Sequence, residues 1–181
     1  ELDLMAVKSY EELVEKVTKA VAEAEPGEWI VGRGWHQDKW DHRPEKVVKG
    51  FQTHDMLSAV SPDNPVFLRH ASGHAGLANA KAMEMAGVNQ LSAERMQSGL
   101  SGEGGEIIRD DLGNPTGIFN ERAMGLITRH IPANTPSRDA EALARAMAAC
   151  LKNGITGFHD AGASQSSIDL FKKFRDDDQL K

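Results

Sequence analysis

The sequence has very little cysteine, with a single residue, Cys150, in a chain of 181. One cysteine cannot form a disulfide within the chain. Its position in an alanine-rich helical pattern is typical of a small buried residue rather than of a nucleophile. This cysteine usage is compatible with a reducing compartment, and we expect a cytoplasmic protein.

Long apolar runs and an excess of positive charge are also absent. There is no stretch of eighteen apolar residues, and the first residues, 1–4, lack the basic and apolar regions of a signal peptide. The chain carries 21 Lys and Arg against 27 Asp and Glu, a net charge of −6. Because contact with phosphate backbones depends on clustered Lys and Arg, we expect neither nucleic acid nor a membrane as a partner.

Several catalytic motifs are missing as well. The sequence has no Gly-x-Ser-x-Gly elbow, no Walker loop, no complete dinucleotide fingerprint and no His-Glu-x-x-His. His70 and His74 have the spacing of a helical zinc pair, but Ser72 and Gly73 lie between them and a strand-like run precedes them. The sequence therefore does not favour a self-contained zinc site.

The remaining pattern predicts an α/β protein of one domain or slightly more. Ser9 with Glu12 forms a capping box that starts a helix ending before Pro26. We expect a polar surface loop over 89–106. Further helices are predicted over 53–60, 79–86, 120–130 and 135–153, strands over 28–34 and 66–70, and a hairpin over 106–119.

The last third of the chain predicts a helix, a short buried strand over 154–159 and a helix capped by Ser166. His159 and Asp160 lie at the end of that strand, where ligands and catalytic groups gather in parallel α/β enzymes. The alternative is structural, since Asp often caps the next helix and His often bonds a loop carbonyl. Side chains alternate along a strand, so the two residues need not share a pocket.

Two other candidates are ambiguous in the same way. Glu121 is a possible carboxylate base, or a charge favoured at the start of a helix. Trp29, Trp35 and Trp40 offer stacking surfaces, but tryptophan is more often a packing residue, so we expect at most one to line a pocket.

Several phrases occur together in a characteristic order. In that order the sequence resembles the amidohydrolase superfamily, in its amidohydrolase 3, or YtcJ-like, group. The phrases are Val7-Lys8-Ser9, Glu28-Trp29-Ile30-Val31-Gly32-Arg33-Gly34-Trp35, Pro65-Val66-Phe67-Leu68-Arg69, Gly73-His74-Ala75 with Asn79, Gly105-Glu106-Ile107-Ile108-Arg109-Asp110, Gly113-Asn114-Pro115-Thr116-Gly117, Glu121, Gly154-Ile155-Thr156 and His159-Asp160-Ala161-Gly162.

This resemblance implies a metal-dependent hydrolase of amide and related C–N bonds, built on a (β/α)₈ barrel with an α/β insertion. Residues 1–134 are then expected to form the insertion subdomain, and 135–181 one early helix–strand–helix unit of an incomplete barrel. A divalent metal, typically zinc, is implied for the full-length family, where it activates water and polarises the carbonyl. The family's His-x-His pair and later ligands are absent from this sequence, so we expect a fragment that is inactive in isolation and binds no metal by itself.

The resemblance also implies roles for individual residues. His159, Asp160 and Glu121 match positions near the reaction centre and are the expected catalytic or supporting residues. His74, Asn79 and Trp35 are the expected contacts to a small-molecule substrate. No residue of the chain is expected to be a metal ligand. The family's Arg-x-Asp-Gly-His phrase is altered here, with an extra residue and with Ser72 in place of the acid.

Two alternatives stay open. One is a stand-alone small-molecule-binding or interaction module, with Trp35, Trp40 and His74 lining its cleft. The other is a small metallohydrolase whose ligands come from His36, His42, His74, Glu121 or His159, across a homodimer interface. Because part of a barrel would leave apolar faces and strand edges uncovered, we also expect a homo-oligomer.

Overall fold

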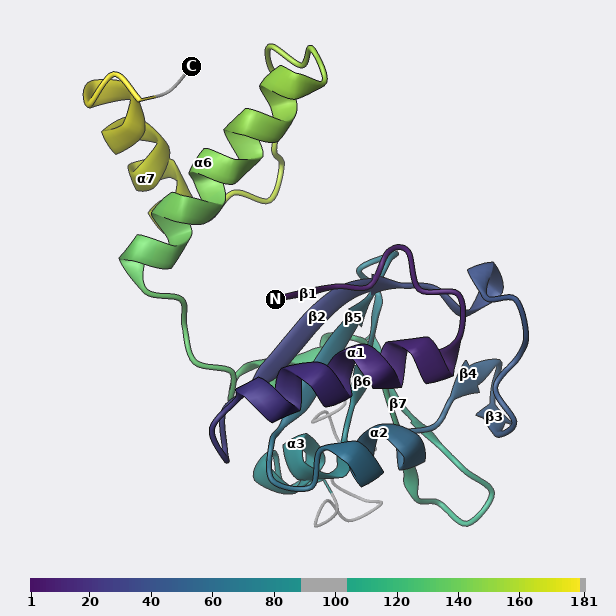
Figure 1. Cartoon of the computed structure of the whole chain (residues 1–181). Helices are drawn as coiled ribbons and strands as arrows, with labels where there is room; N and C mark the ends of the chain where they lie inside the picture. Colours follow the sequence, from purple (N-terminus) through teal and green to yellow (C-terminus); the bar gives the residue numbers. More distant parts are fainter. Residues whose placement is uncertain (89–103, 180–181) are drawn as a thin grey trace. The chain divides into compact units, whose positions relative to one another are not determined.

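The computed structural model of the chain describes residues 1–88 and 104–179 (Figure 1). The chain forms two compact units, Glu1–Pro132 and Ala133–Lys181, and each is described by itself. No described helix combines the length and the apolar character needed to cross a lipid bilayer.

A six-stranded sheet forms the centre of the first unit, in the order β1-β2-β5-β6-β8-β7. The first three of these are parallel, and β5, β6, β8 and β7 pair antiparallel. A separate antiparallel hairpin joins β3 to β4. The strands are β1 (Leu2–Asp3), β2 (Ile30–Trp35), β3 (Val47–Val48), β4 (Phe51–Gln52), β5 (Val66–His70), β6 (Ala75–Ala78), β7 (Gly105–Arg109) and β8 (Pro115–Glu121).

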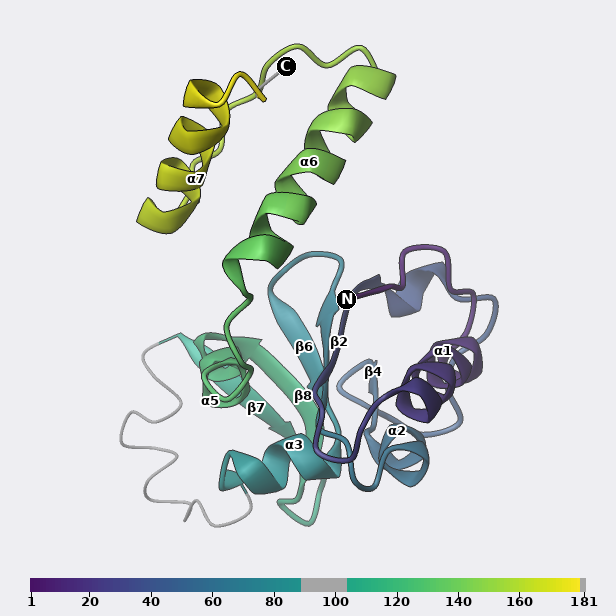
Figure 2. The same ribbon diagram turned by 60° about the vertical axis from the view of Figure 1, so that its left-hand side comes forward.

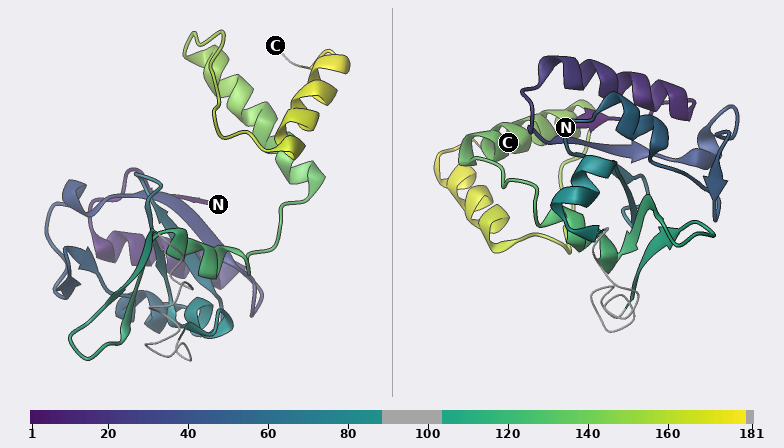
Figure 3. Two further views of the ribbon diagram at one scale, coloured as in Figure 1. Left: turned by 180° about the vertical axis from the view of Figure 1, so that it is seen from behind. Right: turned by 90° about the horizontal axis from the view of Figure 1, so that it is seen from below.

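Helices cover both faces of this sheet (Figure 2 and Figure 3). On one face lie α1 (Tyr10–Glu23) and α2 (Asp55–Val60), and on the other α3 (Ala80–Met85) and α5 (Gly125–Thr128). Two short 3₁₀ turns, η1 (Gln37–Lys39) and η4 (Arg122–Met124), follow β2 and β8.

The central strands supply side chains to both layers, because successive residues of a strand point to opposite faces. Leu68 and Leu77 belong to the core under α1 and α2, whereas their neighbours Phe67 and Ala78 belong to the core under α3 and α5. A strand covered on both sides reads as a continuous apolar run, as in 66–68. The predicted α/β class is thereby confirmed.

Several predicted elements are confirmed with their caps. The Ser9 side chain accepts from the backbone N–H of Glu12 and starts α1. The strand predicted over 66–70 is β5 with the same bounds. The predicted hairpin is formed by β7 and β8.

Other predictions are corrected by the structure. The helix expected over 120–130 is shorter, because β8 continues to Glu121 and only a 3₁₀ turn and the four-residue α5 follow. Strand β6 was not predicted, since its small residues lack the β-branched and aromatic side chains that favour strands. Of the surface loop expected over 89–106, residues 89–103 lie outside the described residues, and the last two belong to β7.

The second unit contains α6 (Pro136–Lys152) and α7 (Gln165–Asp176). Thr135 caps α6 with Pro136 at its first position, as the sequence predicts. Ser164, not Ser166, caps α7. The strand expected over 154–159 is not formed, because a strand requires a hydrogen-bonded neighbour and the described residues of this unit offer none. The assignment of the two units to an insertion and a barrel unit stays a prediction.

Candidate functional site

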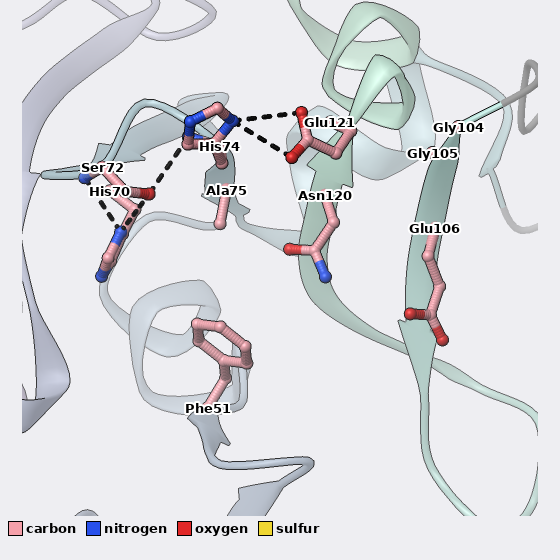
Figure 4. Close-up of a pocket in the computed structure, with 10 residues that line it drawn as sticks. All are labelled: Phe51, His70, Ser72, His74, Ala75, Gly104, Gly105, Glu106, Asn120 and Glu121. Atoms are coloured by element: carbon pink, nitrogen blue, oxygen red, sulfur yellow. Dashed lines mark hydrogen bonds and ion pairs between the residues drawn. The ribbon is translucent and has the colours of Figure 1, made fainter.

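A hollow of about 590 Å³ opens where strands of the six-stranded sheet end (Figure 4). Strands β5 and β8 end there, and β6 and β7 begin there, so four segments distant in sequence contribute side chains. Phe51 of the β3–β4 hairpin contributes an aromatic wall. The residues lining the hollow are Phe51, His70, Ser72, His74, Ala75, Gly104, Gly105, Glu106, Asn120 and Glu121.

His74 and Glu121 contact each other in this hollow. The Nδ1 atom of His74 lies 3.1 Å from Oε1 and 3.2 Å from Oε2 of Glu121. The backbone N–H of Glu121 also donates to the carbonyl of His74, at 2.8 Å. This double contact follows from the register of β6 on β8, which pairs Ala75 with Asn120. The structure thus brings together two residues that the sequence singled out separately.

The backbone of Glu121 is strained. Its φ is +50° with ψ −127°, a conformation that favours glycine and that side-chain-bearing residues rarely adopt. The strain lies where β8 ends and turns into η4, and it holds the carboxylate against the His74 ring. Strained residues of this kind cluster at functional sites, so the outlier singles out Glu121 among the lining residues.

Ser72 fixes the turn between β5 and β6. Its hydroxyl accepts from the backbone N–H of His74 at 3.1 Å and contacts Nδ1 of His70 at 2.8 Å. The Ser72 backbone N–H donates to the same His70 nitrogen, at 3.1 Å. Gly73 has a φ of +78°, which the tight turn requires. Ser72 therefore organises the loop that carries His74.

His70 forms the buried end of the hollow, with only 8% of its surface exposed. Its ring centroid lies 4.6 Å from that of Trp35 and 4.5 Å from that of His36. Burial, followed by the repulsion of His36, lowers the pKa of His70 to about 4. His70 is therefore neutral at physiological pH and contributes a polar but uncharged wall.

An ion pair crosses the mouth of the hollow. Lys49, at the tip of the β3–β4 hairpin, lies 2.6 Å from Oε1 of Glu106 on β7. Both side chains are more than half exposed, so the pair contributes little to stability. Phe51 and Glu121 both line the hollow (Figure 4). The hollow thus combines one apolar wall with two carboxylates that each have a partner.

The structure places the other predicted site residues differently. Trp35 is fully buried and its indole N–H donates to the carbonyl of Leu68 at 2.9 Å, so it packs in the core and has no surface to offer a substrate. Asn79 is also fully buried and caps α3. Both positions correct the expectation of direct substrate contact by these two residues.

His159 and Asp160 lie in the exposed segment between α6 and α7. Asp160 accepts from the backbone N–H of Gly162 at 2.8 Å within its own turn, whereas the cap of α7 that the structural alternative assigned to it is provided by Ser164. Their catalytic role stays a prediction.

Among the described residues, no group of three or more His, Cys, Asp or Glu side chains is placed to hold a metal ion. The His42 ring pairs with Glu11 at 3.0 Å, and the His36 ring accepts from the backbone N–H of Asp38 in its own turn. The donor sets of the described residues therefore do not fit the divalent metal that the family resemblance implies. The alternative of a self-contained metallohydrolase gains no support from them.

Sequence reasoning missed several lining residues. His70 was noted only as half of a zinc spacing, and Ser72 only as an interruption of that spacing and a departure from the family's phrase, although Ser72-Gly73 is a turn signal. Phe51 and Glu106 carry no local signal, because they join the hollow only through tertiary contacts.

Comparison with known proteins adds an independent finding. The sequence profile described as the amidohydrolase family matches residues 1–180. The protein LONG AFTER FAR-RED 3 of Arabidopsis thaliana is 33% identical over 162 residues, which are 90% of this chain and 25% of that protein. The N-substituted formamide deformylase of Arthrobacter pascens is 32% identical over 167 residues, 90% of this chain and 28% of the enzyme.

The fold also occurs in a solved structure, an uncharacterized metal-dependent hydrolase from Pyrococcus horikoshii OT3. The two structures superpose with a TM-score of 0.56 at 21% identity, over 98% of this chain and 30% of the other. The chain therefore spans less than a third of each of these three proteins.

Proposed function

This chain belongs to the amidohydrolase family, and from that membership we propose that it binds the substrate of a hydrolase that cleaves C–N bonds of small molecules. The binding site in this proposal is the hollow at the strand ends. The contact between His74 and Glu121 carries the proposal, because it joins two residues 47 positions apart at a strained backbone position.

The relatives support the chemistry. One is an N-substituted formamide deformylase, and the solved structure is that of an uncharacterized metal-dependent hydrolase. An amide presents a carbonyl acceptor and, when secondary, one N–H donor. The hollow offers complementary groups in Asn120, His74 and the Glu121 carboxylate, with Phe51 as a surface for an apolar substituent.

A divalent metal in the whole protein would polarise the amide carbonyl and activate water. Because the described residues do not supply its ligands, we derive no step of the reaction through it. His159 and Asp160 remain the proposed catalytic residues from the second unit. The residues of the hollow bind and orient the substrate, and the Glu121 carboxylate disfavours anionic ligands.

The 181-residue chain is accordingly proposed to bind small amides without hydrolysing them. The alternative is a stand-alone binding or interaction module without catalysis, and both proposals predict that this chain alone releases no amine. The test uses N-ethylformamide and N-benzylacetamide, with and without added Zn²⁺. Binding is followed by the backbone amide shifts of Glu106, Asn120 and Glu121 in ¹H–¹⁵N spectra, and hydrolysis by release of the free amine.

We expect saturable shifts at these three residues and no amine release. His74→Ala should weaken binding about tenfold, because it removes a hydrogen-bonding group from the hollow. His42→Ala is the matched control, since His42 forms a similar exposed pair with Glu11 outside the hollow. If the chain does not bind these amides, or if His74→Ala and His42→Ala weaken binding equally, the hollow is not the binding site. Amine release by the chain would contradict its inactivity in isolation.

A further inference from the structure

The two ring nitrogens of His74 have different surroundings. Nδ1 faces the carboxylate of Glu121, which has no hydrogen to donate and can only accept. Within the part of the chain that the structure describes, Nε2 has no hydrogen-bond partner, and the side chain is 71% exposed. In the neutral imidazole the proton therefore resides on Nδ1, and the lone pair on the accessible Nε2.

From this asymmetry we propose that His74 presents Nε2 as a hydrogen-bond acceptor to the ligand, and that the hollow selects secondary amides over tertiary ones. The N–H of a secondary amide donates to Nε2, and its substituent packs on Phe51. A tertiary amide has no N–H to donate. This inference rests on the proposed function, since it assumes that the ligand is an amide.

Three features of the site favour a neutral N–H donor as the ligand. The acceptor at Nε2 pairs with a donor. The Glu121 carboxylate faces the same opening and repels an anionic ligand. The aromatic face of Phe51 accommodates an apolar substituent on the amide nitrogen.

Glu121 acts as the positioning residue in this arrangement. Its own backbone N–H bonds the His74 carbonyl, so carboxylate and imidazole are held together at both ends. The positive φ of Glu121 costs conformational energy and is explained by the geometry that this contact requires. Ser72 restrains His74 from the other side of the turn.

The chain provides an internal reference for the tautomer. His42 faces a carboxylate with its other nitrogen, Nε2, at 3.0 Å from Glu11. His42 and His74 are both largely exposed and each faces one glutamate, yet the predicted tautomers are opposite. The two histidines can therefore be compared in one spectrum of one sample.

The first test measures ring-nitrogen chemical shifts by long-range ¹H–¹⁵N spectroscopy of the labelled chain at pH 8, where imidazoles are neutral. We expect a protonated Nδ1 and a bare Nε2 for His74, and the reverse for His42. In Glu121→Gln, where the side-chain amide can donate as well as accept, His74 should shift toward a mixture of tautomers while His42 stays unchanged. A protonated Nε2 on His74 in the unaltered chain would overturn the inference.

The second test compares N-benzylacetamide with N-benzyl-N-methylacetamide, which differ only in the replacement of the N–H by N–CH₃. One hydrogen bond predicts a preference of about threefold to tenfold for the secondary amide. That preference should fall toward one in His74→Phe and shrink in Glu121→Gln, while His42→Ala keeps it.

The outcomes separate this inference from the proposed function. Equal binding of both amides, with the hollow still responding, would overturn the selection by Nε2 and leave the proposed function standing. Absence of binding by both amides would overturn both. A preference for the secondary amide that survives in His74→Phe would overturn the inference, because a group other than His74 would then accept the amide N–H.

Discussion

The amide nitrogen of Asn79 donates to both the hydroxyl and the carbonyl of Ser61, at 2.8 and 3.0 Å. It also donates to the carbonyl of Asn64, and its oxygen accepts from the backbone N–H groups of Val66 and Ala82. One buried side chain therefore links the turn before β5 to the first turn of α3. The side chain of Asn79 therefore holds the turn and the helix against the sheet, and it is buried away from the hollow.

Asn79→Ala should lower the free energy of unfolding by at least about 3 kcal/mol, because it leaves several buried backbone groups without partners. Urea unfolding followed by circular dichroism measures the change. Asn114→Ala is the matched control, since Asn114 is exposed and bonds only within its own turn with Asp110. A loss below about 1 kcal/mol for Asn79→Ala would contradict the role of this network.

Replacing Glu121 is expected to affect stability and amide binding in different ways. Glycine adopts a φ of +50° freely, whereas alanine does not, so Glu121→Gly should be more stable than Glu121→Ala by about 1 kcal/mol or more. Both variants lose the carboxylate, so both should bind amides more weakly than the unaltered chain. Thermal unfolding and the amide titration are measured side by side. Equal stability of the two variants would show that the backbone at this position carries no strain.

Because the pKa of buried His70 is lowered, we expect the free energy of unfolding to fall in mild acid. Its folded-state pKa is about 4, against 6.5 for an unperturbed histidine, so below pH 6.5 the unfolded chain takes up a proton that the folded chain does not. Stability is unaffected above that pH and falls by up to about 3 kcal/mol as the pH drops from 6.5 to 4.

His54, whose pKa is also lowered by burial, adds a slope in the same pH range, so the informative quantity is a difference between variants. His70→Asn keeps an acceptor near Nδ1 for the Ser72 backbone N–H and removes the titration. Its unfolding free energy should fall less steeply between pH 6.5 and 4.5 than that of the unaltered chain. Parallel pH profiles for the two proteins would contradict the burial of a neutral His70.

Local sequence signals predicted much of the fold. The capping box at Ser9 and the apolar run of β5 are short-range features, and the structure has them where the sequence places them. β6 was missed because it consists of small residues, and its strand character depends on its neighbours β5 and β8. The strand expected over 154–159 is not formed. Its apolar pattern suits a strand, but a strand also needs a neighbour with which to form hydrogen bonds, and the described residues of the second unit provide none.

The site was predictable only in part. His74 and Glu121 were each singled out, but their contact depends on the register between β6 and β8, which local patterns do not encode. Trp35 was expected to contact substrate, although tryptophan is more often a packing residue than a stacking surface. The carbonyl of Leu68 decides between these, and it is 33 positions away. Membership of the amidohydrolase family, by contrast, was predicted from ordered phrases along the whole chain and is confirmed.

Gly76 of β6 lies under an aromatic ring and has no room for a side chain. A Cβ at this position would collide with the ring of Phe67 on β5, so only glycine allows the ring to lie over the strand. Gly76→Ala should therefore lower the free energy of unfolding by about 1 to 3 kcal/mol, the usual cost of overpacking a core. Gly125→Ala is the control: no atom lies near its added Cβ and its φ is −59°, so the change should stabilise by up to about 1 kcal/mol.

A second substitution tests the cause. Phe67→Leu alone leaves a small gap and should destabilise, but it makes room for the new methyl group. The double variant Phe67→Leu/Gly76→Ala should then be more stable than the sum of the single changes predicts, by at least about 0.5 kcal/mol. Urea unfolding of the four proteins completes the cycle. Additive losses would mean that the ring of Phe67 is not what excludes a side chain at Gly76, and that the cost arises from the backbone of β6 itself.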